Sequence, residues 1–289
     1  MNLLDYRRNI TSEHGEDGIL ERLFEVLGEG SHYCIELGAL DGKHGSNVWH
    51  LVHDKKWSAL LIEADPTYFE KLQARFAGRP DVICVNAFVS FEGSQTLDCI
   101  CERVSAPHEP DLLSLDIDGN DYHVWESFSA YRPRVVVVEF NPSIPNHISF
   151  IQSRDMRVQQ GSSIKALVEL GRKKGYELVA VTDTNAVFVL QELFGKFGIS
   201  DNSLGALRTG HRYETVLFQL YDGTLVIEGN KELIWHHVPI DAEQLQVLPP
   251  SRRKYPARTS PEGGVRQLKY YIRKLPLYFL MQKIRKLFL

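Results

Sequence analysis

The sequence predicts an α/β fold: a doubly wound sheet of seven strands with an antiparallel last strand, followed by a small β extension and a basic helical tail. Three observations predict the sheet. Short apolar runs rich in Val, Ile and Leu recur along the chain, as in strands buried on both faces of a parallel sheet. Helix-like segments separate these runs. Two final runs are joined by a turn too short for a crossover, so they should be antiparallel neighbours.

The composition is that of a globular protein that needs no covalent staple. The chain has 289 residues, of which 43% are hydrophobic and 24% are charged. A chain of this size can bury about three quarters of its unfolded surface. Cys34 and Cys84 lie in apolar runs, and the C-x-C pair Cys99 and Cys101 lacks a partner pair at zinc-ligand spacing. Without an apolar leader or a membrane-length apolar stretch, we expect a cytoplasmic protein with reduced thiols.

The elements of the first two thirds follow from periodicity. An N-terminal helix is expected over 12–28, because Ile19, Leu23 and Leu27 share one face. The strands are expected at 33–37, 58–64, 81–87, 111–117 and 134–140, with helices at 45–54, 66–77, 97–103 and 121–130 between them. A further helix should run from Ser162 to about Lys174, before strands at 176–182 and 186–190 that turn near Asn185.

In the last third of the chain, the periodicity of apolar residues is weaker. Residues 213–229 read as a β-hairpin that turns at Asp222-Gly223. Several prolines from 249 onward mark a linker. We therefore divide the chain into a main domain over 1–195, a small β extension over 196–248, and a linker with a basic tail over 249–289.

Charge is concentrated in the tail. Residues 252–289 hold eleven Lys or Arg and one acid, which gives +10, whereas the other 251 residues hold 22 basic and 36 acidic side chains, which gives −14. An acidic body disfavours nucleic acid as a partner. The segment 265–289 alternates apolar and basic residues at helical spacing, which suits either peripheral contact with the inner face of a membrane or docking on protein.

Ligands of open α/β sheets bind at the carboxyl ends of the strands, so the residues there are the site candidates. Glu36-Leu37-Gly38-Ala39-Leu40-Asp41-Gly42 follows the first strand. Its glycines permit a tight turn, and its two carboxylates suit a positively charged ligand better than a phosphate. Neither a dinucleotide fingerprint nor a nucleoside triphosphate loop is present in the sequence.

The next two strand ends suggest a nucleoside. Glu63 ends the second strand, where a carboxylate can accept hydrogen bonds from both ribose hydroxyls. The third strand ends in Asn86-Ala87, which suits the edge of an adenine. A nucleoside with a cationic, non-phosphorylated extension fits these residues, and S-adenosylmethionine is such a molecule.

Several motifs resemble those of the FkbM-type class I S-adenosylmethionine-dependent methyltransferases: IELGALDG, LIEADP, NAFVS, LLSLDIDGNDYHVWESF and VVVVEFNPSIP, over roughly 30–190. The resemblance implies a Rossmann-like fold and O-methylation of sugars and related small hydroxylated molecules. It also implies a set of cofactor contacts, running from the methionine end through the ribose to the adenine: Glu36, Gly38, Ala39, Asp41, Gly42, Asp116, Glu63, Ala64, Asn86 and Ala87. Its fourth-strand motif, Asp116 to Asp121, is more acidic here than is usual in the family.

Acidic residues gather at the fourth and fifth strand ends. Carboxylates that converge without cations repel one another unless a hard divalent ion or a cationic ligand neutralises them. Asp116, Asp118, Glu139 and Asn141 are therefore candidate ligands of Mg²⁺ or Mn²⁺. In the alternative, Asp116 faces the cofactor, Asp121 or Asn120 caps the following helix, and no metal binds.

His123 and Asp118 are the candidate catalytic residues. His123 falls in the first turn of a helix, where the dipole keeps the imidazole neutral and able to act as a base. The alternative is an ordinary surface histidine in a first turn. His44 and His147 are weaker candidates on nearby loops.

These observations favour methyl transfer from S-adenosylmethionine to a hydroxyl of a sugar, a glycan, a lipid-linked glycan or a related small molecule. Two alternatives remain open at this point. One is N-methylation of a small amine. The other is a non-catalytic binding or membrane-adaptor protein on the same fold.

Overall fold

The computed structural model describes residues 1–28 and 30–255, which belong to two compact units divided between Glu214 and Thr215. Each unit is described by itself. The predicted basic tail over 265–289 lies outside the described residues. The domain boundaries expected at 195 and 248 stay predictions.

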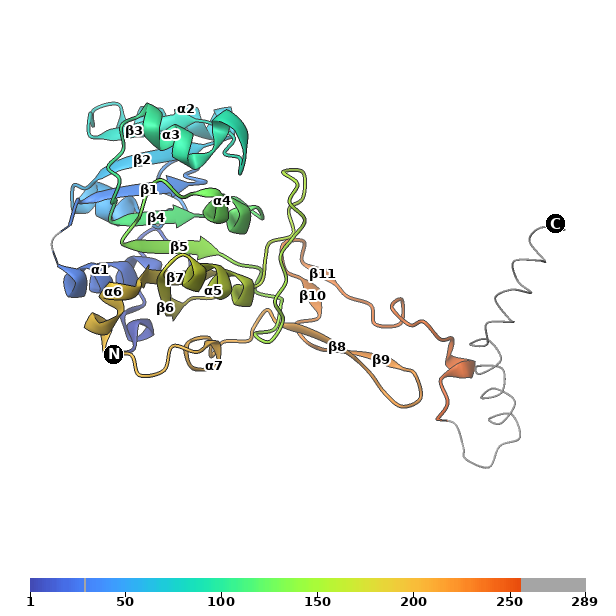
Figure 1. Cartoon of the computed structure of the whole chain (residues 1–289). Coiled ribbons are helices and arrows are strands. Elements are labelled where there is room, and N and C mark those ends of the chain that lie inside the picture. The colour runs from blue at the N-terminus through green and yellow to red at the C-terminus, as the bar shows by residue number, and fades with distance from the viewer. Residues whose placement is uncertain (29, 256–289) are drawn as a thin grey trace, which may run out of the picture. The chain divides into compact units, whose positions relative to one another are not determined.

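The first unit contains the predicted seven-stranded Rossmann-like sheet, in the order β3-β2-β1-β4-β5-β7-β6 (Figure 1). The strands are β1 Tyr33–Leu37, β2 Ser58–Glu63, β3 Val82–Asn86, β4 Leu112–Leu115, β5 Val135–Glu139, β6 Tyr176–Val181 and β7 Asn185–Leu190. Strand β7 lies between β5 and β6 and is antiparallel to both, whereas β1 to β5 are all parallel to one another. The predicted antiparallel last strand is confirmed.

The helices match most of the expected segments. They are α1 Glu16–Leu27, α2 Pro66–Phe76, α3 Leu97–Arg103, α4 Asp121–Ser127, α5 Ile164–Lys173, α6 Gln191–Phe194 and α7 Leu204–Leu207. The helix expected over 45–54 is reduced to a π-helical turn, His50–Asp54. The reason lies in the preceding residues, because the Ser46 hydroxyl and the Asn47 backbone N–H both donate to Glu36 and hold this stretch in a loop.

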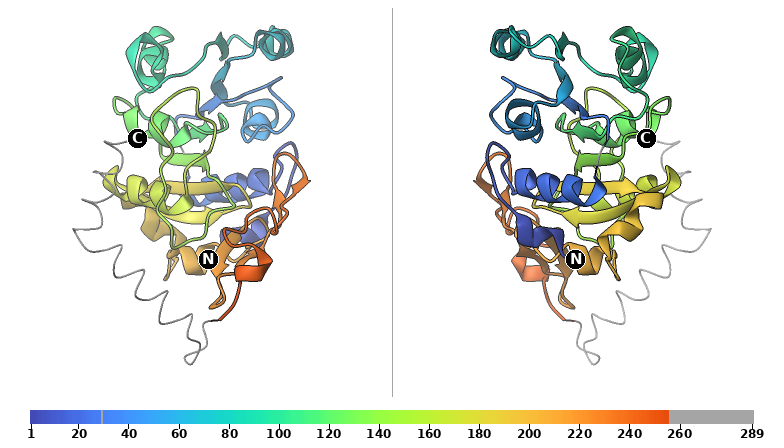
Figure 2. Two further views of the ribbon diagram at one scale, coloured as in Figure 1. Left: turned by 90° about the vertical axis from the view of Figure 1, so that its right-hand side faces the viewer. Right: turned by 90° about the vertical axis from the view of Figure 1, so that its left-hand side faces the viewer.

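The sheet is covered on both faces (Figure 1; Figure 2). Alternate residues of each strand point to opposite sides, so Ile35 and Leu37 pack in one cluster with Trp125 of α4. The intervening Cys34 packs in a second cluster with Leu20 of α1. Helices α3, α4 and α5 thus cover one face and α1 and α2 the other, which leaves the carboxyl edge of the parallel strands open to a ligand.

Helix α1 is tied to the turn between β6 and β7. Glu16 is fully buried at the start of α1. Its Oε1 accepts hydrogen bonds from Thr182 Oγ1 (2.6 Å) and Asn185 Nδ2 (3.1 Å). A single carboxylate therefore joins two segments that lie far apart in the sequence.

The second unit, as far as Tyr255, is built of short antiparallel strands. Strands β8 Thr215–Gln219 and β9 Leu225–Gly229 form the predicted hairpin, and β10 Glu232–Leu233 pairs with β11 Val238–Pro239. Gly223 adopts φ +88° in the hairpin turn, and Asp222 accepts a hydrogen bond from Thr224 N. The predicted turn at Asp222-Gly223 is confirmed.

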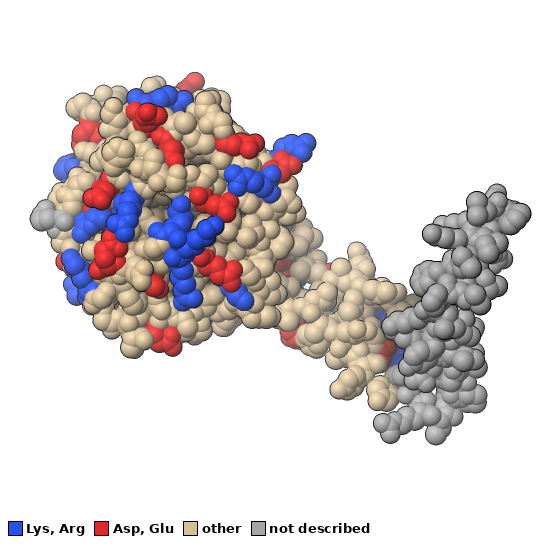
Figure 3. Space-filling model, in the orientation of Figure 1, with Lys and Arg blue, Asp and Glu red and all other residues tan. Residues whose placement is uncertain are grey.

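Two properties of the described residues bear on the predictions about nucleic-acid and membrane partners. Basic and acidic side chains are interspersed over the visible face of the first unit (Figure 3). Among the described residues, no helix combines the length and the apolar character needed to cross a bilayer.

Candidate functional site

A cavity of about 370 Å³ lies at the carboxyl ends of β1, β2 and β4, where the sheet architecture predicts a ligand site. Its lining includes six of the predicted site residues: Gly38, Glu63, Ala64, Ala87, Asp116 and Asp118. The remaining lining residues are Glu13, Leu37, Leu40, Gly45, Ile62, Phe88, Val89, Ile117, Asn120, Met156 and Gln159.

Gly38 brings the ends of β1 and β4 into close approach. It adopts φ +73°, and a Cβ atom built on it would lie 1.9 Å from the backbone oxygen of Asp116. The N–H groups of Gly38 and Ala39 both donate to the carbonyl oxygen of Ile62 in β2. The chain can therefore turn here only without a side chain, which keeps the cavity floor at backbone level.

Glu63 is a fixed carboxylate on the cavity wall. It is 6% exposed, and its two oxygens each accept one backbone hydrogen bond, from Leu40 N and from Asp65 N, both at 2.7 Å. Each carboxylate oxygen can accept a second hydrogen bond. Glu63 can therefore bind a ligand with two donors while it holds the glycine turn in place.

Glu36 and Asp41 are not among the residues that line the cavity, and their direct contact with a cofactor stays a prediction. Burial raises the pKa of Glu36 to about 7, although hydrogen bonds from Ser46 and Asn47 oppose the rise. Burial also acts to raise the pKa of Asp41, but hydrogen bonds from the His44 backbone and ring and from Lys43 N hold it well below its usual value. Both carboxylates instead fix the shape of the loop after β1.

Other predicted cofactor residues are also used within the protein. The Asn86 amide nitrogen donates to the backbone oxygens of Glu63 (2.8 Å) and Ala64 (3.1 Å). Ala39 is 1% exposed, and Gly42 packs against Leu72 and Phe76. None of these three lines the cavity. The wall beyond β3 is formed by Ala87, Phe88 and Val89, of which Phe88 is 61% exposed.

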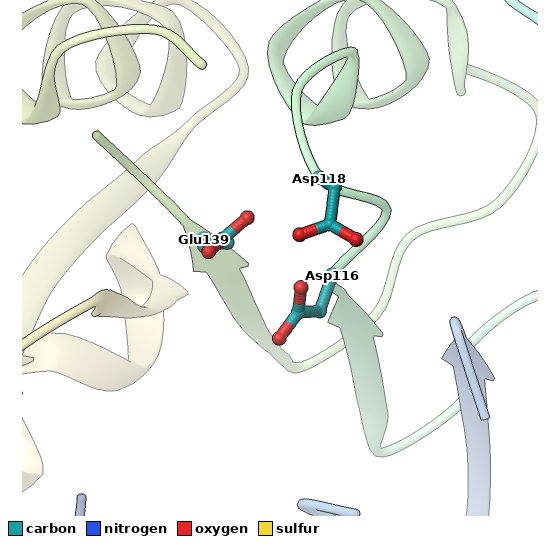
Figure 4. Close-up of side chains that lie close together, drawn as sticks. All are labelled: Asp116, Asp118 and Glu139. Atoms are coloured by element: carbon teal, nitrogen blue, oxygen red, sulfur yellow. The ribbon is translucent and has the colours of Figure 1, made fainter. Parts of the chain in front are cut away.

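Three carboxylates converge between β4 and β5 (Figure 4). One oxygen from each of Asp116, Asp118 and Glu139 lies within 4.8 Å of the others. Burial, followed by the neighbouring charges of Asp121 and Asp118, raises the pKa of Asp116 well above its ordinary value. Burial and the nearby Asp116 do the same for Glu139. This cluster therefore favours a bound proton or a bound cation.

Two nearby residues expected near this cluster support loops instead. Asp121 accepts hydrogen bonds from Ile117 N and Gly119 N, and burial raises its pKa to about 6 against the effect of these bonds. Asn141 donates to the carbonyl oxygen of Gln160 at 2.7 Å and accepts from Ser143 N and Oγ. Both ends of its amide are thus hydrogen-bonded within the protein, and its role as a metal ligand stays a prediction.

His123 is not among the residues that line the cavity, and its role as a base stays a prediction. It is 5% exposed, and its Nε2 lies 3.0 Å from the backbone oxygen of Gln152. Its ring packs edge-on against Phe91 and Tyr122. The first turn of α4 is covered by the segment around Gln152, which the sequence pattern did not reveal. Of the predicted catalytic pair, only Asp118 reaches the cavity.

The segment between β5 and α5 supplies lining residues that sequence reasoning missed. Gln152 is 2% exposed, and its Oε1 accepts hydrogen bonds from Gln160 N and Gly161 N, while its Nε2 donates to Val158 O. This buried side chain closes the segment into a loop that brings Met156 and Gln159 to the cavity. No strand-end rule could identify these two residues, because the loop lies far from any strand end in the sequence.

The cavity lining is acidic. Its charged residues are Glu13, Glu63, Asp116 and Asp118, and no Lys, Arg or His from the described part of the chain is among them. Such a lining repels phosphate and carboxylate groups and attracts cations. A positively charged or uncharged ligand is therefore favoured.

No family model and no curated protein matches the chain. Among solved structures, it is similar to monomeric WbdD, with 17% identity and a TM-score of 0.38 over 59% of this chain and 38% of that one. It is similar to an O-methyltransferase from Bacillus cereus in complex with SAH, with 20% identity and a TM-score of 0.41 over 59% and 78% of the two chains. It is also similar to the N-terminal domain of EvdMO1 in the presence of SAH and D-fucose, with 13% identity and a TM-score of 0.39 over 60% and 81%. The chain thus spans well under two thirds of WbdD.

Proposed function

We propose that this protein is an S-adenosylmethionine-dependent methyltransferase that acts on a hydroxyl group. The observation that carries the proposal is Glu63, a buried carboxylate fixed on the cavity wall beside the Gly38 turn. A carboxylate at the end of the second strand of such a sheet suits the two hydroxyls of a ribose. The exposed ring of Phe88 on the adjoining wall offers a surface for a planar base.

The acidic lining suits the rest of this cofactor. S-adenosylmethionine has a sulfonium, an ammonium and one carboxylate group, so it is a net cation, and the carboxylates of the cavity can stabilise its two positive charges. When bound, it supplies an electrophilic methyl group. The protein must then hold the acceptor oxygen about 3–3.5 Å from that carbon.

Asp118 is the proposed base for the acceptor hydroxyl. It is exposed and lines the cavity, in contrast to the buried His123. In that role Asp118 would accept the proton of the acceptor hydroxyl, while the bound cofactor would supply the methyl group and leave as a neutral thioether.

The proposed acceptor is a sugar, a glycan or a related hydroxylated molecule. Two points support it: the resemblance of the strand-end motifs to FkbM-type enzymes, and the lack of cations among the described lining residues, which disfavours acceptors whose anionic groups would enter the cavity. The same lining favours a second candidate, N-methylation of a small amine, because an ammonium group would be attracted to these carboxylates.

The cofactor assignment is tested by calorimetric titration with S-adenosylmethionine. Glu63→Gln should weaken binding at least tenfold, because an amide can accept only one of the two backbone hydrogen bonds and presents one fewer acceptor to the ribose. Glu70→Gln, an exposed change of the same chemistry on α2, is the control and should bind like the wild type. Equal affinities in a folded Glu63→Gln protein would contradict the ribose assignment.

A further inference from the structure

We propose that β8 pairs with β8 of a second copy of this chain, so that two hairpins join into one four-stranded antiparallel sheet. The two-fold axis of this dimer passes beside Leu217, the middle residue of the strand. The pairing uses the open edge of β8 in the second unit. It depends neither on the cavity nor on the proposed methyltransferase function.

The hairpin of β8 and β9 leaves most of its apolar side chains in solvent (Figure 1). Among the residues of these two strands, only Ile227 is buried. Leu217, directly opposite it, is 55% exposed, and Phe218 on the other face of the strand is 42% exposed. A two-stranded sheet is only marginally stable in water, and three or more strands are needed for independent stability. We therefore expect a further strand beside this hairpin.

The two edges of the hairpin differ in how they are covered. At the β9 edge, Leu225 N donates to Gln246 Oε1 at 2.9 Å, and Leu225 O accepts from Gln246 Nε2 at 2.8 Å. The side-chain amide of Gln246 thus takes the place of a neighbouring strand. At the β8 edge, no residue of the described chain up to Tyr255 forms such backbone hydrogen bonds. The open edge is therefore that of β8.

The hydrogen bonds of Leu225 also establish which backbone groups of β8 point outward. Two residues directly opposite each other in an antiparallel pair turn their backbone groups either toward each other or both away. Leu225 lies opposite Gln219 and turns its groups away from β8. Because the direction alternates along a strand, Gln219, Leu217 and Thr215 each present an N–H and a C=O at the open edge.

A second β8 strand fits this edge in register and in chemistry. When two copies pair with Leu217 opposite Leu217, Thr215 lies opposite Gln219, so that outward N–H and C=O groups meet across the axis. Val216 then lies opposite Phe218, and pairs of β-branched and aromatic residues stabilise sheets. Charged residues and proline commonly protect an exposed edge, but the strand TVLFQ contains neither. No like charges are therefore brought together.

A copy of this chain is favoured over a strand of another protein because a two-fold pair satisfies both open edges at once. The resulting sheet ends at β9 on each side, where Gln246 covers the edge. Within β8 and β9, the charged residue is Glu228. It lies on β9, so the two inner strands separate it from its equivalent in the other copy.

The dimer is tested by sedimentation-velocity ultracentrifugation of the full chain over a range of concentrations. We expect the wild type to form a dimer. Leu217→Lys should raise the dissociation constant of this dimer at least tenfold, because two like charges then lie directly opposite each other. Leu217 is exposed, so this variant should fold, which circular dichroism verifies. Leu233→Lys, the same change at an exposed position on β10, is the control and should sediment like the wild type.

Oxidative cross-linking tests the register. In the Leu217→Cys variant, the Cα atoms of the two substituted residues lie about 5.5 Å apart across the axis, which a disulfide can span. In Leu220→Cys, they lie about 20 Å apart, because each is three residues from the axis. Copper phenanthroline should therefore join the chains of the first variant and not those of the second. The wild type, with its four native cysteines, gives the background.

Three results would overturn the proposal. They are a wild-type monomer at the highest soluble concentration, a dimer that folded Leu217→Lys does not weaken, and equal cross-linking of the two cysteine variants. A monomer in which the amides of Thr215, Leu217 and Gln219 exchange slowly with deuterium would assign the edge to another segment of the same chain instead. None of these measurements uses S-adenosylmethionine, so failure of the dimer and failure of the cofactor assignment are distinguishable.

Discussion

Gly38 is the residue on which the shape of the cavity depends most directly. Its left-handed backbone and its approach to the Asp116 carbonyl leave no space for even a methyl group. Gly28 offers a matched comparison, because its φ is +74° and a Cβ atom built on it would meet nothing within 4 Å. A comparison of alanine substitutions at Gly38 and Gly28 therefore separates the energetic cost of backbone strain from the cost of the close approach.

We expect Gly38→Ala to lower the free energy of unfolding by at least about 2 kcal/mol more than Gly28→Ala, measured in urea. Both variants carry the strain of a positive φ, which is about 1–2 kcal/mol, but only the first forces β1 and β4 apart. Gly38→Ala should also weaken binding of S-adenosylmethionine. Similar losses of stability in both variants would show that the close approach is not important.

Glu36 should make stability depend on pH. Its pKa is about 7 in the folded protein against an ordinary value of 4.5, because it is buried. Between these values the folded state keeps a proton that the unfolded state has released, so stability falls as the pH rises. The contribution of this group is complete below pH 4.5 and is lost as the pH passes through 7.

The variant Glu36→Gln has no ionisable group at this position. Its unfolding free energy should therefore not show this fall as the pH rises. Between pH 4.5 and 8, the wild type should lose about 2–3 kcal/mol of unfolding free energy relative to the variant, as measured by denaturant titrations at each pH. Parallel stability profiles for the two proteins would argue against a raised pKa at this position.

At the scale of elements, the strand pattern was predictable and the loops were not. A strand buried on both faces produces a continuous apolar run, so β1 to β7 were located from local composition alone. The loop roles of Glu36, Asp41, Asn86 and Asn141 depend on hydrogen bonds to backbone atoms. A strand-end rule recognises where a carboxylate or an amide lies but not which way it points.

The attachment of α1 to the β6–β7 turn gives an element-scale prediction. Glu16→Ala leaves the buried Thr182 and Asn185 side chains without their shared acceptor. Such a change should lower the unfolding free energy by about 2–3 kcal/mol. Glu25→Ala on the same helix removes only an exposed pair with Arg22 and should cost less than about 1 kcal/mol. If Glu16→Ala and Glu25→Ala lowered the unfolding free energy by similar amounts in thermal and urea unfolding, the hydrogen bonds of Glu16 would contribute little to stability.

The whole molecule combines an acidic body with the basic segment over 252–289. We propose that this segment binds anionic membranes, since each Lys or Arg near such a surface contributes about 1 kcal/mol. The full chain should sediment with anionic vesicles but not with neutral ones, and salt should release it.

Charge-matched variants test the location of this contact. The double change Arg285→Gln with Lys286→Gln should reduce sedimentation with anionic vesicles several-fold. Arg172→Gln with Lys173→Gln removes the same two charges from an exposed part of α5 and should leave it unchanged. Equal effects of the two pairs would point to general attraction by net charge rather than to the C-terminal segment.

In the loop closed by Gln152, the side chain that holds the loop together is different from the side chains that line the cavity. Its closure is provided by one buried side chain and backbone atoms, whereas Met156 and Gln159, which reach the cavity, take no part in those bonds. Mutations at these two positions can therefore accumulate without loss of the loop. Divergence among descendants of this protein, and laboratory evolution toward new ligands, should concentrate at Met156 and Gln159 while Gln152 stays unchanged.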